Sequence, residues 1–220
     1  MEFILKIQSV DSVTHDVHRF RLDKPDGYAF TPGQATEVSV NKPGWENERR
    51  PFTFTCLNSD PYLEFTIKSY PRGGVTEQIG QLKAGDELIV RDVWGAIEYK
   101  GEGYFIAGGA GITPFIAILR QLHSEGKAKG NKLFFSNKTS QDIIYQKELK
   151  DILGENAVFV ITNEKKSPYA TGYIDERFLT ANIRDFTKHF YICGPDPMIK
   201  AISEILTKKG AEPEAVIFEK

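Results

Sequence analysis

The sequence predicts two successive domains: an antiparallel β-barrel or sandwich, followed by an α/β domain with a parallel sheet. In the first half, short alternating apolar segments are separated by turn signals, which is typical of antiparallel strands. After Gly101, continuous apolar runs alternate with helical patterns, as expected for buried parallel strands covered on both faces. The pattern changes at residues 100–103, so we expect domains at residues 1–101 and 102–220.

The elements of the first half follow from period-2 patterns and their breaks. Apolar residues alternate at residues 3–7, 38–40, 63–67 and 88–90, and residues 50–53 begin a further strand. Clusters rich in Pro, Gly, Asn and Asp separate them at residues 25–27, 31–33, 41–44, 58–61 and 84–86. One short helix is expected at residues 75–82.

The second half alternates buried strands with helices. Strands are expected at residues 104–107, 133–135, 157–161, 190–193 and 216–218. Helical patterns lie between most of them, at residues 114–124, 142–153, 175–180 and 197–208. In open parallel sheets, ligands bind beyond the carboxyl ends of the strands, so the residues that follow these strands are candidate site residues.

Composition excludes several classes of function. The formal net charge of −2 gives no general attraction to nucleic acid or to an anionic membrane. No apolar run approaches the ~20 residues that span a bilayer, and the alternating N-terminus lacks the features of a signal peptide. We therefore expect a cytoplasmic protein. The two cysteines and four histidines form no metal-ligand pattern, so we expect no metal and assign any redox chemistry to an organic cofactor.

Two motifs in the first half are candidate binding sites. Arg50-Pro51-Phe52-Thr53 offers a planar cationic fork, an aromatic face and a hydroxyl group, although an edge arginine beside a core phenylalanine has the same pattern. Gly73-Gly74-Val75-Thr76 opens the short helix, where backbone N–H groups favour an anion. The alternative is that Thr76 only caps that helix.

Two motifs in the second half follow predicted strands. Gly108, Gly109 and Gly111 lie between a strand and the helix that begins near Pro114, which indicates either close approach of a ligand or a tight turn. The second motif, Cys193-Gly194-Pro195-Asp196-Pro197-Met198, places Cys193 at the carboxyl edge of the sheet. A small buried cysteine is the alternative explanation.

Together and in this order, the four motifs resemble the signature of the ferredoxin–NADP reductase family, and the resemblance covers nearly the whole chain. The matching segments are Arg50-x-Phe52-Thr53, Gly73-x-x-Thr76, Gly109-x-Gly111-x-x-Pro114 and Cys193-Gly194-x-x-x-Met198. The resemblance implies a six-stranded antiparallel FAD-binding barrel and a C-terminal parallel-sheet domain that binds NADPH or NADH.

The resemblance also implies roles for individual residues. Arg50 contacts the flavin pyrophosphate, Phe52 packs on the isoalloxazine, and Thr53 lies near flavin N5. Cys193 lies by the nicotinamide C4, and Glu219 aligns with a family glutamate near the active site, so Thr53, Cys193 and Glu219 are the expected catalytic residues. The expected cofactor-binding residues are Arg50, Pro51, Phe52, Thr53, Ile67, Lys68, Gly73, Gly74, Val75, Thr76, Gly109, Ala110, Gly111, Thr113, Pro114, Thr162, Lys165, Tyr173, Cys193, Gly194, Pro195 and Met198.

The sequence departs from the family pattern in three places. Phe52 replaces the usual tyrosine, and no aromatic residue follows Glu219 to cover the flavin. Where NADPH users often have Ser/Thr-Arg, this chain has Thr162-Asn163, with Lys165 and Lys166 nearby, which leaves the choice of nucleotide open. Tyr173 is a candidate for packing on the adenine.

The resemblance implies an NAD(P)H-dependent flavoprotein reductase with FAD preferred over FMN. We expect a monomer that passes single electrons to a separate carrier, such as flavodoxin or ferredoxin. A basic rim for an acidic carrier would use Lys6, Arg49, Lys68 and Arg72, unless these are scattered surface charges. The alternatives are a flavin or ferric reductase, an electron-transfer subunit of a larger complex, and a nucleotide-sensing protein.

Overall fold

The computed structural model of the chain describes residues 1–71, 73–95, 97–164, 166–211 and, for the backbone, 216–218. Its contacts divide the chain into two compact units. The first comprises Met1–Glu98 together with Thr113–Gln121, and the second comprises Tyr99–Ile112 together with Leu122–Lys220. Within the described residues, no helix is both long enough and apolar enough to cross a lipid bilayer.

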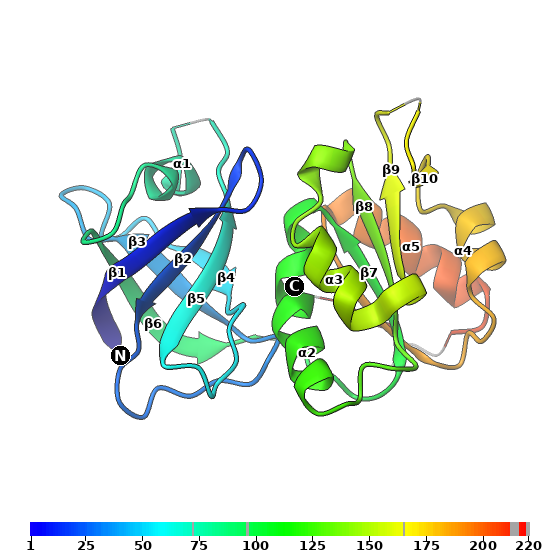
Figure 1. Cartoon of the computed structure of the whole chain (residues 1–220), viewed down its shortest axis with the longest axis horizontal. Coiled ribbons are helices and arrows are strands. Elements are labelled where there is room, and N and C mark those ends of the chain that lie inside the picture. The colour runs from blue at the N-terminus through cyan, green and yellow to red at the C-terminus, as the bar shows by residue number, and fades with distance from the viewer. Residues whose placement is uncertain (72, 96, 165, 212–215, 219–220) are drawn as a thin grey trace. The chain divides into compact units, whose positions relative to one another are not determined.

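The first unit is built on a six-stranded antiparallel sheet that curls into a near-barrel, as predicted (Figure 1). The order is β4-β3-β6-β1-β2-β5, and a bridge between Phe54 and Phe65 brings the two edges together. The strands are β1 (Glu2–Ser12), β2 (Val17–Asp23), β3 (Ala35–Val40), β4 (Arg50–Thr53), β5 (Tyr62–Lys68) and β6 (Glu87–Trp94).

The alternating apolar residues of these strands fill the barrel. Leu63 and Phe65 of β5 are fully buried and lie opposite Leu22 and Phe20 of β2. The expected strands did not give bounds for β2, although Phe20 and Leu22 alternate with Arg19 and Arg21 in the period-2 pattern of a half-buried strand.

Two helices belong wholly or mainly to the first unit. Helix α1 (Val75–Gly80) buries Val75 and Ile79 and ends two residues before the predicted boundary. Helix α2 (Thr113–Ser124) follows the first strand of the second unit, yet its residues 113–121 pack with the barrel. The barrel accommodates this helix at Gly33, where a Cβ atom would lie 3.1 Å from Ile118 Cδ1 and 2.3 Å from the Ile97 carbonyl oxygen.

The second unit contains a parallel six-stranded sheet in the order β10-β9-β8-β7-β11-β12. Helices α3 (Gln146–Leu153) and α5 (Asp196–Lys208) lie on opposite faces of it (Figure 1), and α4 (Glu176–Asn182) packs on the α5 face. The strands are β7 (Gly103–Gly108), β8 (Lys132–Asn137), β9 (Ala157–Ile161), β10 (Ala170–Thr171), β11 (His189–Cys193) and β12 (Val216–Phe218).

The helix predicted at residues 142–153 is shorter in the structure. A 3-10 turn over Ser140–Asp142 is closed by a capping box between Thr139 and Asp142. Tyr145 then adopts a left-handed conformation with φ 50°, which an α-helix does not tolerate. The regular helix therefore starts at Gln146.

Candidate functional site

Strand β4 presents the predicted flavin-binding motif on the barrel. Arg50 is exposed, and its Nη1 donates to the Arg49 carbonyl 2.6 Å away. Phe52 is half-buried against the barrel core, so one side of its ring is anchored by packing. Thr53 is 6% exposed, and its hydroxyl has no hydrogen-bond partner among the described protein groups. Among the described residues, neither this guanidinium has a carboxylate partner nor this hydroxyl an acceptor, so both groups are available to a ligand.

The loop that enters α1 leaves its backbone open. Gly73 has φ +71°, a conformation that favours glycine, and a Cβ atom on Gly74 would meet nothing within 4 Å. The alternative that Thr76 caps the helix is wrong: Gly74 is the N-cap residue, and Thr76 Oγ1 accepts from the Tyr70 N–H. The Glu77 carboxylate accepts from the Gly73 N–H, so part of this loop is already held by the protein.

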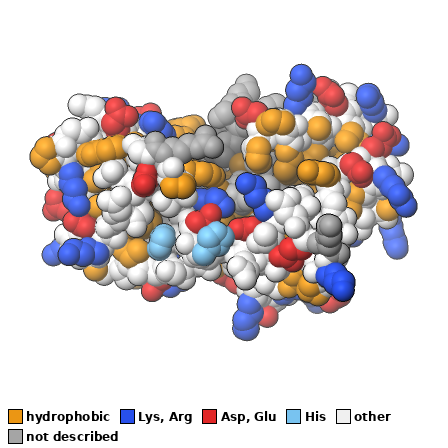
Figure 2. Space-filling model, turned by 90° about the horizontal axis from the view of Figure 1, so that it is seen from above, with side chains coloured by type: hydrophobic (Ala, Val, Ile, Leu, Met, Phe, Trp, Pro, Cys, Tyr) orange, Lys and Arg blue, Asp and Glu red, His pale blue; other side chains and the backbone are white. Residues whose placement is uncertain are grey.

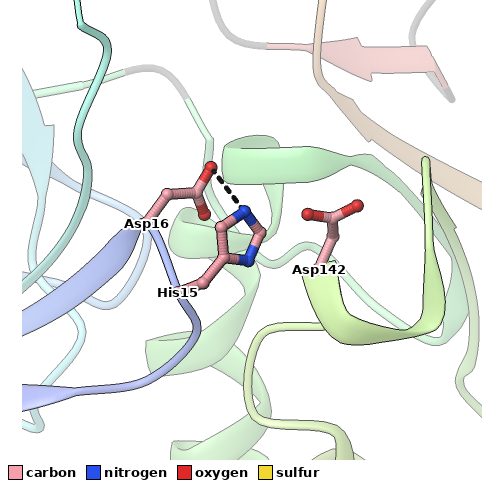
Figure 3. Close-up of side chains that lie close together, drawn as sticks. All are labelled: His15, Asp16 and Asp142. Carbon is pink, nitrogen blue, oxygen red and sulfur yellow. Dashed lines mark ion pairs between the residues drawn. The ribbon is translucent and has the colours of Figure 1, made fainter.

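Lys68, at the end of β5, is engaged by a carboxylate. Its Nζ lies 2.8 Å from Asp16 Oδ2, and the other predicted residue of this strand end, Ile67, is buried in the core. Burial acts to raise the pKa of Asp16, but the hydrogen bond and charge of Lys68 outweigh it and hold the pKa below its usual range. The same carboxylate lies 3.6 Å from His15 Nε2, and Figure 3 shows the two side chains facing each other.

The glycine turn of the second unit is packed against the cysteine motif. A Cβ atom on Gly111 would lie 2.4 Å from the Cys193 carbonyl oxygen, and one on Gly108 would lie 2.6 Å from Met198 Sδ. Gly109 differs, because it has φ +54° and open space around the position of a Cβ atom. The tight-turn explanation is confirmed for Gly108 and Gly111, which allow close packing, whereas the approach of a ligand at Gly109 stays a prediction.

These two motifs meet at the point where the strand order reverses. From β7 the chain proceeds outward to β8, β9 and β10, and then returns to β11 on the other side of β7. Cys193, the last residue of β11, pairs with Ala107, the residue before the last one of β7. Cys193 is 6% exposed at the carboxyl end of β11. A reversal of this kind at the carboxyl edge is where open α/β sheets bind nucleotides.

The edge after β8 and β9 carries the predicted nucleotide-selecting residues. The Thr162 hydroxyl donates to the Asn137 carbonyl at 3.3 Å. Glu164 Oε1 accepts from both the backbone N–H and the hydroxyl of Ser140, at 2.6 and 2.9 Å. Tyr173 is 75% exposed. The sequence reading considered Lys165 here but missed Glu164, although an acidic residue after a strand is a recognisable signal.

Two predicted residues, Lys165 and Glu219, lie outside the described residues. Their assignments remain predictions.

The sequence reading also missed a buried carboxylate in the first unit. Glu64 of β5 is 1% exposed. Its Oε1 accepts from Arg120 Nη1 at 2.7 Å and from Thr55 Oγ1 at 3.0 Å, and its Oε2 accepts from Arg21 Nε at 3.0 Å. Burial acts to raise the pKa of Glu64, but the charge and hydrogen bonds of Arg120, with those of Arg21 and Thr55, bring the pKa below its usual range.

We expect Glu64 to contribute to acid unfolding. A pKa that is lower in the folded state than in the unfolded state stabilises the fold above the unfolded pKa of ~4.3, and this stabilisation is lost as the pH falls through the folded value. Melting temperatures should therefore fall more steeply below about pH 4.3 in the wild type than in Glu64→Gln. If the melting temperatures of the two proteins fall equally steeply between pH 7 and pH 3, this assignment is contradicted.

Within either unit taken alone, the described residues contain no cluster of three His, Cys, Asp or Glu side chains with metal-ligand geometry. Asp142, the third side chain labelled in Figure 3, belongs to the second unit and accepts hydrogen bonds from the Thr139 backbone and hydroxyl. Cys56 and Cys193 form no disulfide.

The sequence of each half matches a known domain family. Residues 4–99 match the oxidoreductase FAD-binding domain, and residues 105–204 match the oxidoreductase NAD-binding domain. The chain therefore consists of an oxidoreductase FAD-binding domain followed by an oxidoreductase NAD-binding domain. These two domain families are those of oxidoreductases that use FAD and a nicotinamide nucleotide, as the sequence motifs predicted.

Curated relatives and solved structures agree with these domain families. The reductase component of propane 2-monooxygenase from Rhodococcus jostii is 29% identical over 238 residues, covering 98% of this chain but 62% of the relative, so the chain spans less than two thirds of that protein. NADH-cytochrome b5 reductase 2-A from Vanderwaltozyma polyspora is 28% identical, covering 90% of this chain and 73% of the relative. A ferredoxin NADP+ reductase from Neisseria gonorrhoeae, solved with FAD and NADP, shares the fold with a TM-score of 0.86 at 19% identity, covering 99% of this chain and 97% of that one.

Proposed function

We propose that the chain is an FAD-dependent NAD(P)H reductase that delivers single electrons to a separate acceptor protein, such as flavodoxin or ferredoxin. The main support is the contact between the two motifs of the second unit, where Gly111 leaves room for the Cys193 backbone at the reversal of strand order. This arrangement gathers a turn with open backbone at Gly109 and a thiol at one sheet edge. The two halves match the FAD-binding and NAD-binding domain families of oxidoreductases, which supports a redox function for that edge of the sheet.

The residues of the barrel fit a flavin. Arg50 would hold the pyrophosphate through its guanidinium, and the Gly74 backbone and the Thr76 hydroxyl would hold further phosphate oxygens. Phe52 would pack on the ring, and the Thr53 hydroxyl would take up a hydrogen bond there. Bound FAD would supply hydride acceptance and one-electron release, and the chain would supply binding and orientation.

The residues of the second unit fit a nicotinamide nucleotide. The Gly109–Pro114 turn would hold its pyrophosphate, and Cys193 would border the nicotinamide. At the ribose edge, Glu164 and the absence of an arginine at residue 163 favour NADH over NADPH, because a carboxylate accepts from a ribose hydroxyl but repels a phosphate. The exposed Lys138 and Lys166 lie in the same region, and their positive charges would act in the opposite sense to Glu164 by attracting a phosphate.

The basic rim expected to recognise an acidic acceptor consists of Lys6, Arg49, Lys68 and Arg72. Arg49 pairs with Glu2 and Glu37, and Lys68 pairs with Asp16, so two members of the proposed basic rim are already neutralised. Lys6 is exposed, and Arg72 lies outside the described residues. On the face in Figure 2, coloured basic and acidic side chains are interspersed without a large patch of one sign.

A second candidate function is the reductase component of a multi-component oxygenase, which the name of the Rhodococcus relative supports. A panel of acceptors separates the two candidates. It would contain ferredoxin, flavodoxin, cytochrome b5, an oxygenase component and free FMN with ferric citrate. Fast turnover with free FMN or ferric citrate alone would favour a flavin or ferric reductase.

The first experiment is an anaerobic absorbance titration of the purified protein with NADH and, separately, with NADPH. We expect flavin bands that bleach faster with NADH. A colourless protein that does not take up added FAD, or bound flavin that neither nucleotide bleaches, would contradict the proposed function.

Replacing Cys193 by alanine should slow flavin reduction by the nucleotide while leaving the flavin bound. The reason is that Cys193 borders the proposed nicotinamide site in the second unit, whereas the flavin motifs lie on the barrel. Stopped-flow reduction rates per bound flavin measure this effect. A rate equal to that of the wild type would make Cys193 a packing residue only.

A further inference from the structure

We propose that Arg120 and Glu64 are positioning residues for nicotinamide-dependent reduction of the flavin. Their ion pair holds helix α2 in one orientation on the barrel, and the glycine turn proposed to bind the nucleotide runs directly into this helix. The inference rests on the proposed function, and neither residue is expected to touch a cofactor.

The barrel side of the pair is a fully buried charge. Glu64 lies on the outer face of β5, because its neighbours Leu63 and Phe65 point into the core. Its side chain is nevertheless 1% exposed and receives hydrogen bonds on both carboxylate oxygens. An outward-facing strand residue is expected to be solvated, but Glu64 is buried and its partners Arg21, Thr55 and Arg120 all belong to the first unit.

On the helix side of the pair, one nitrogen of Arg120 donates to two acceptors. Arg120 Nη1 donates to Glu64 Oε1 and also to the Thr55 carbonyl oxygen. Two residues earlier on the same helix, Ile118 lies over Gly33, where a side chain would displace it. Polar and apolar contacts at neighbouring positions therefore fix both the rotation of α2 and its distance from the barrel.

The energetics indicate that the ion pair serves to orient helix α2 on the barrel rather than to stabilise the fold. Burying two charges has a large desolvation cost, and apolar residues of similar volume often stabilise a fold equally well. A guanidinium nitrogen that donates both to a carboxylate and to a backbone carbonyl oxygen, however, imposes a direction that apolar packing does not. Small errors in placing a donor over an acceptor reduce the rate of transfer about a hundredfold, so a directional anchor at α2 has a catalytic consequence.

The test compares Arg120→Met with the wild type and with a control, Lys42→Met. The control removes an ion pair of the same unit, in which Lys42 Nζ lies 3.3 Å from Asp86, without touching α2. Anaerobic stopped flow gives the limiting rate of flavin reduction at saturating NADH, per bound flavin, well below the melting temperature. Dithionite reduces the flavin without a nucleotide site and reports whether the flavin itself is intact.

We expect Arg120→Met to lower the limiting rate about tenfold or more, with unchanged dithionite reduction and flavin spectrum. Arg120→Lys should recover part of the rate, and Lys42→Met should match the wild type. A lower melting temperature with a wild-type limiting rate would overturn the inference.

If Arg120→Met does not fold, Glu64→Gln carries the test, because it keeps the shape of the side chain and removes its charge. It should also lower the limiting rate, and a wild-type rate would overturn the inference. A wild-type protein that neither NADH nor NADPH reduces would instead overturn the proposed function, so the two failures are distinguishable.

Discussion

Replacing Arg50 by alanine is expected to release FAD from the barrel. Arg50 is exposed at the start of β4, and its guanidinium has no carboxylate partner among the described residues. Hydrogen bonds to charged groups contribute about 1.5–3 kcal/mol, which corresponds to roughly a 10- to 150-fold weaker affinity when one is lost. Fluorescence titration of the apoprotein with FAD measures this change.

The neighbouring arginine provides a matched control for that experiment. Arg49 is also exposed, but its guanidinium pairs with Glu2 and Glu37, each at 3.3 Å. Arg49→Ala should therefore leave FAD affinity within about twofold of the wild type, because surface ion pairs contribute little. Equal losses in the two variants would indicate general electrostatic attraction, and no loss in either would remove the pyrophosphate assignment.

Replacing Gly111 by alanine is expected to destabilise the second unit and to abolish nucleotide binding. The new Cβ atom would lie 2.4 Å from the Cys193 carbonyl oxygen and 2.6 Å from the Gly194 nitrogen. Both are backbone atoms, so no rotamer change relieves the overlap, and the cost should reach or exceed the 1–3 kcal/mol typical of overpacking. Thermal unfolding followed by circular dichroism measures the loss of stability.

Gly109 supplies the control in the same turn. It has φ +54° and no atom within 4 Å of a Cβ position, and asparagine tolerates such a conformation. Gly109→Asn should therefore change the free energy of unfolding by less than about 1 kcal/mol. If Gly111→Ala is as stable as Gly109→Asn, the close packing of the two motifs is not needed for the fold.

The class of fold and the identity of the motifs followed from the sequence because both are local properties. Alternation over a few residues predicted β5 and β6, and continuous apolar runs predicted β7 and β9. Glycine and proline at fixed offsets predicted where the chain turns at the carboxyl edge of the parallel sheet. The local pattern failed where one residue with positive φ, Tyr145, shortened a helix.

Residue roles were harder to predict, because they depend on partners that lie far away in the sequence. Lys68 looked like a cationic ligand residue, but the fold pairs it with Asp16. Thr76 was compatible with a capping role, but Gly74 is the N-cap residue and the helix begins at Val75. Nothing in the sequence around Glu64 distinguished it from a solvated carboxylate on an outer strand face.

The sequence alone therefore determined that a barrel precedes a parallel sheet, that four motifs follow one another in a fixed order, and that the domain families are those of FAD- and nicotinamide-dependent oxidoreductases. Only the tertiary structure decided that Gly111 makes room for the Cys193 backbone and that Glu64 is buried beneath Arg120. The physical reason is that burial, close approach and charge pairing are set by all the segments that meet at one place, whereas periodicity and turn chemistry are set by neighbours along the chain.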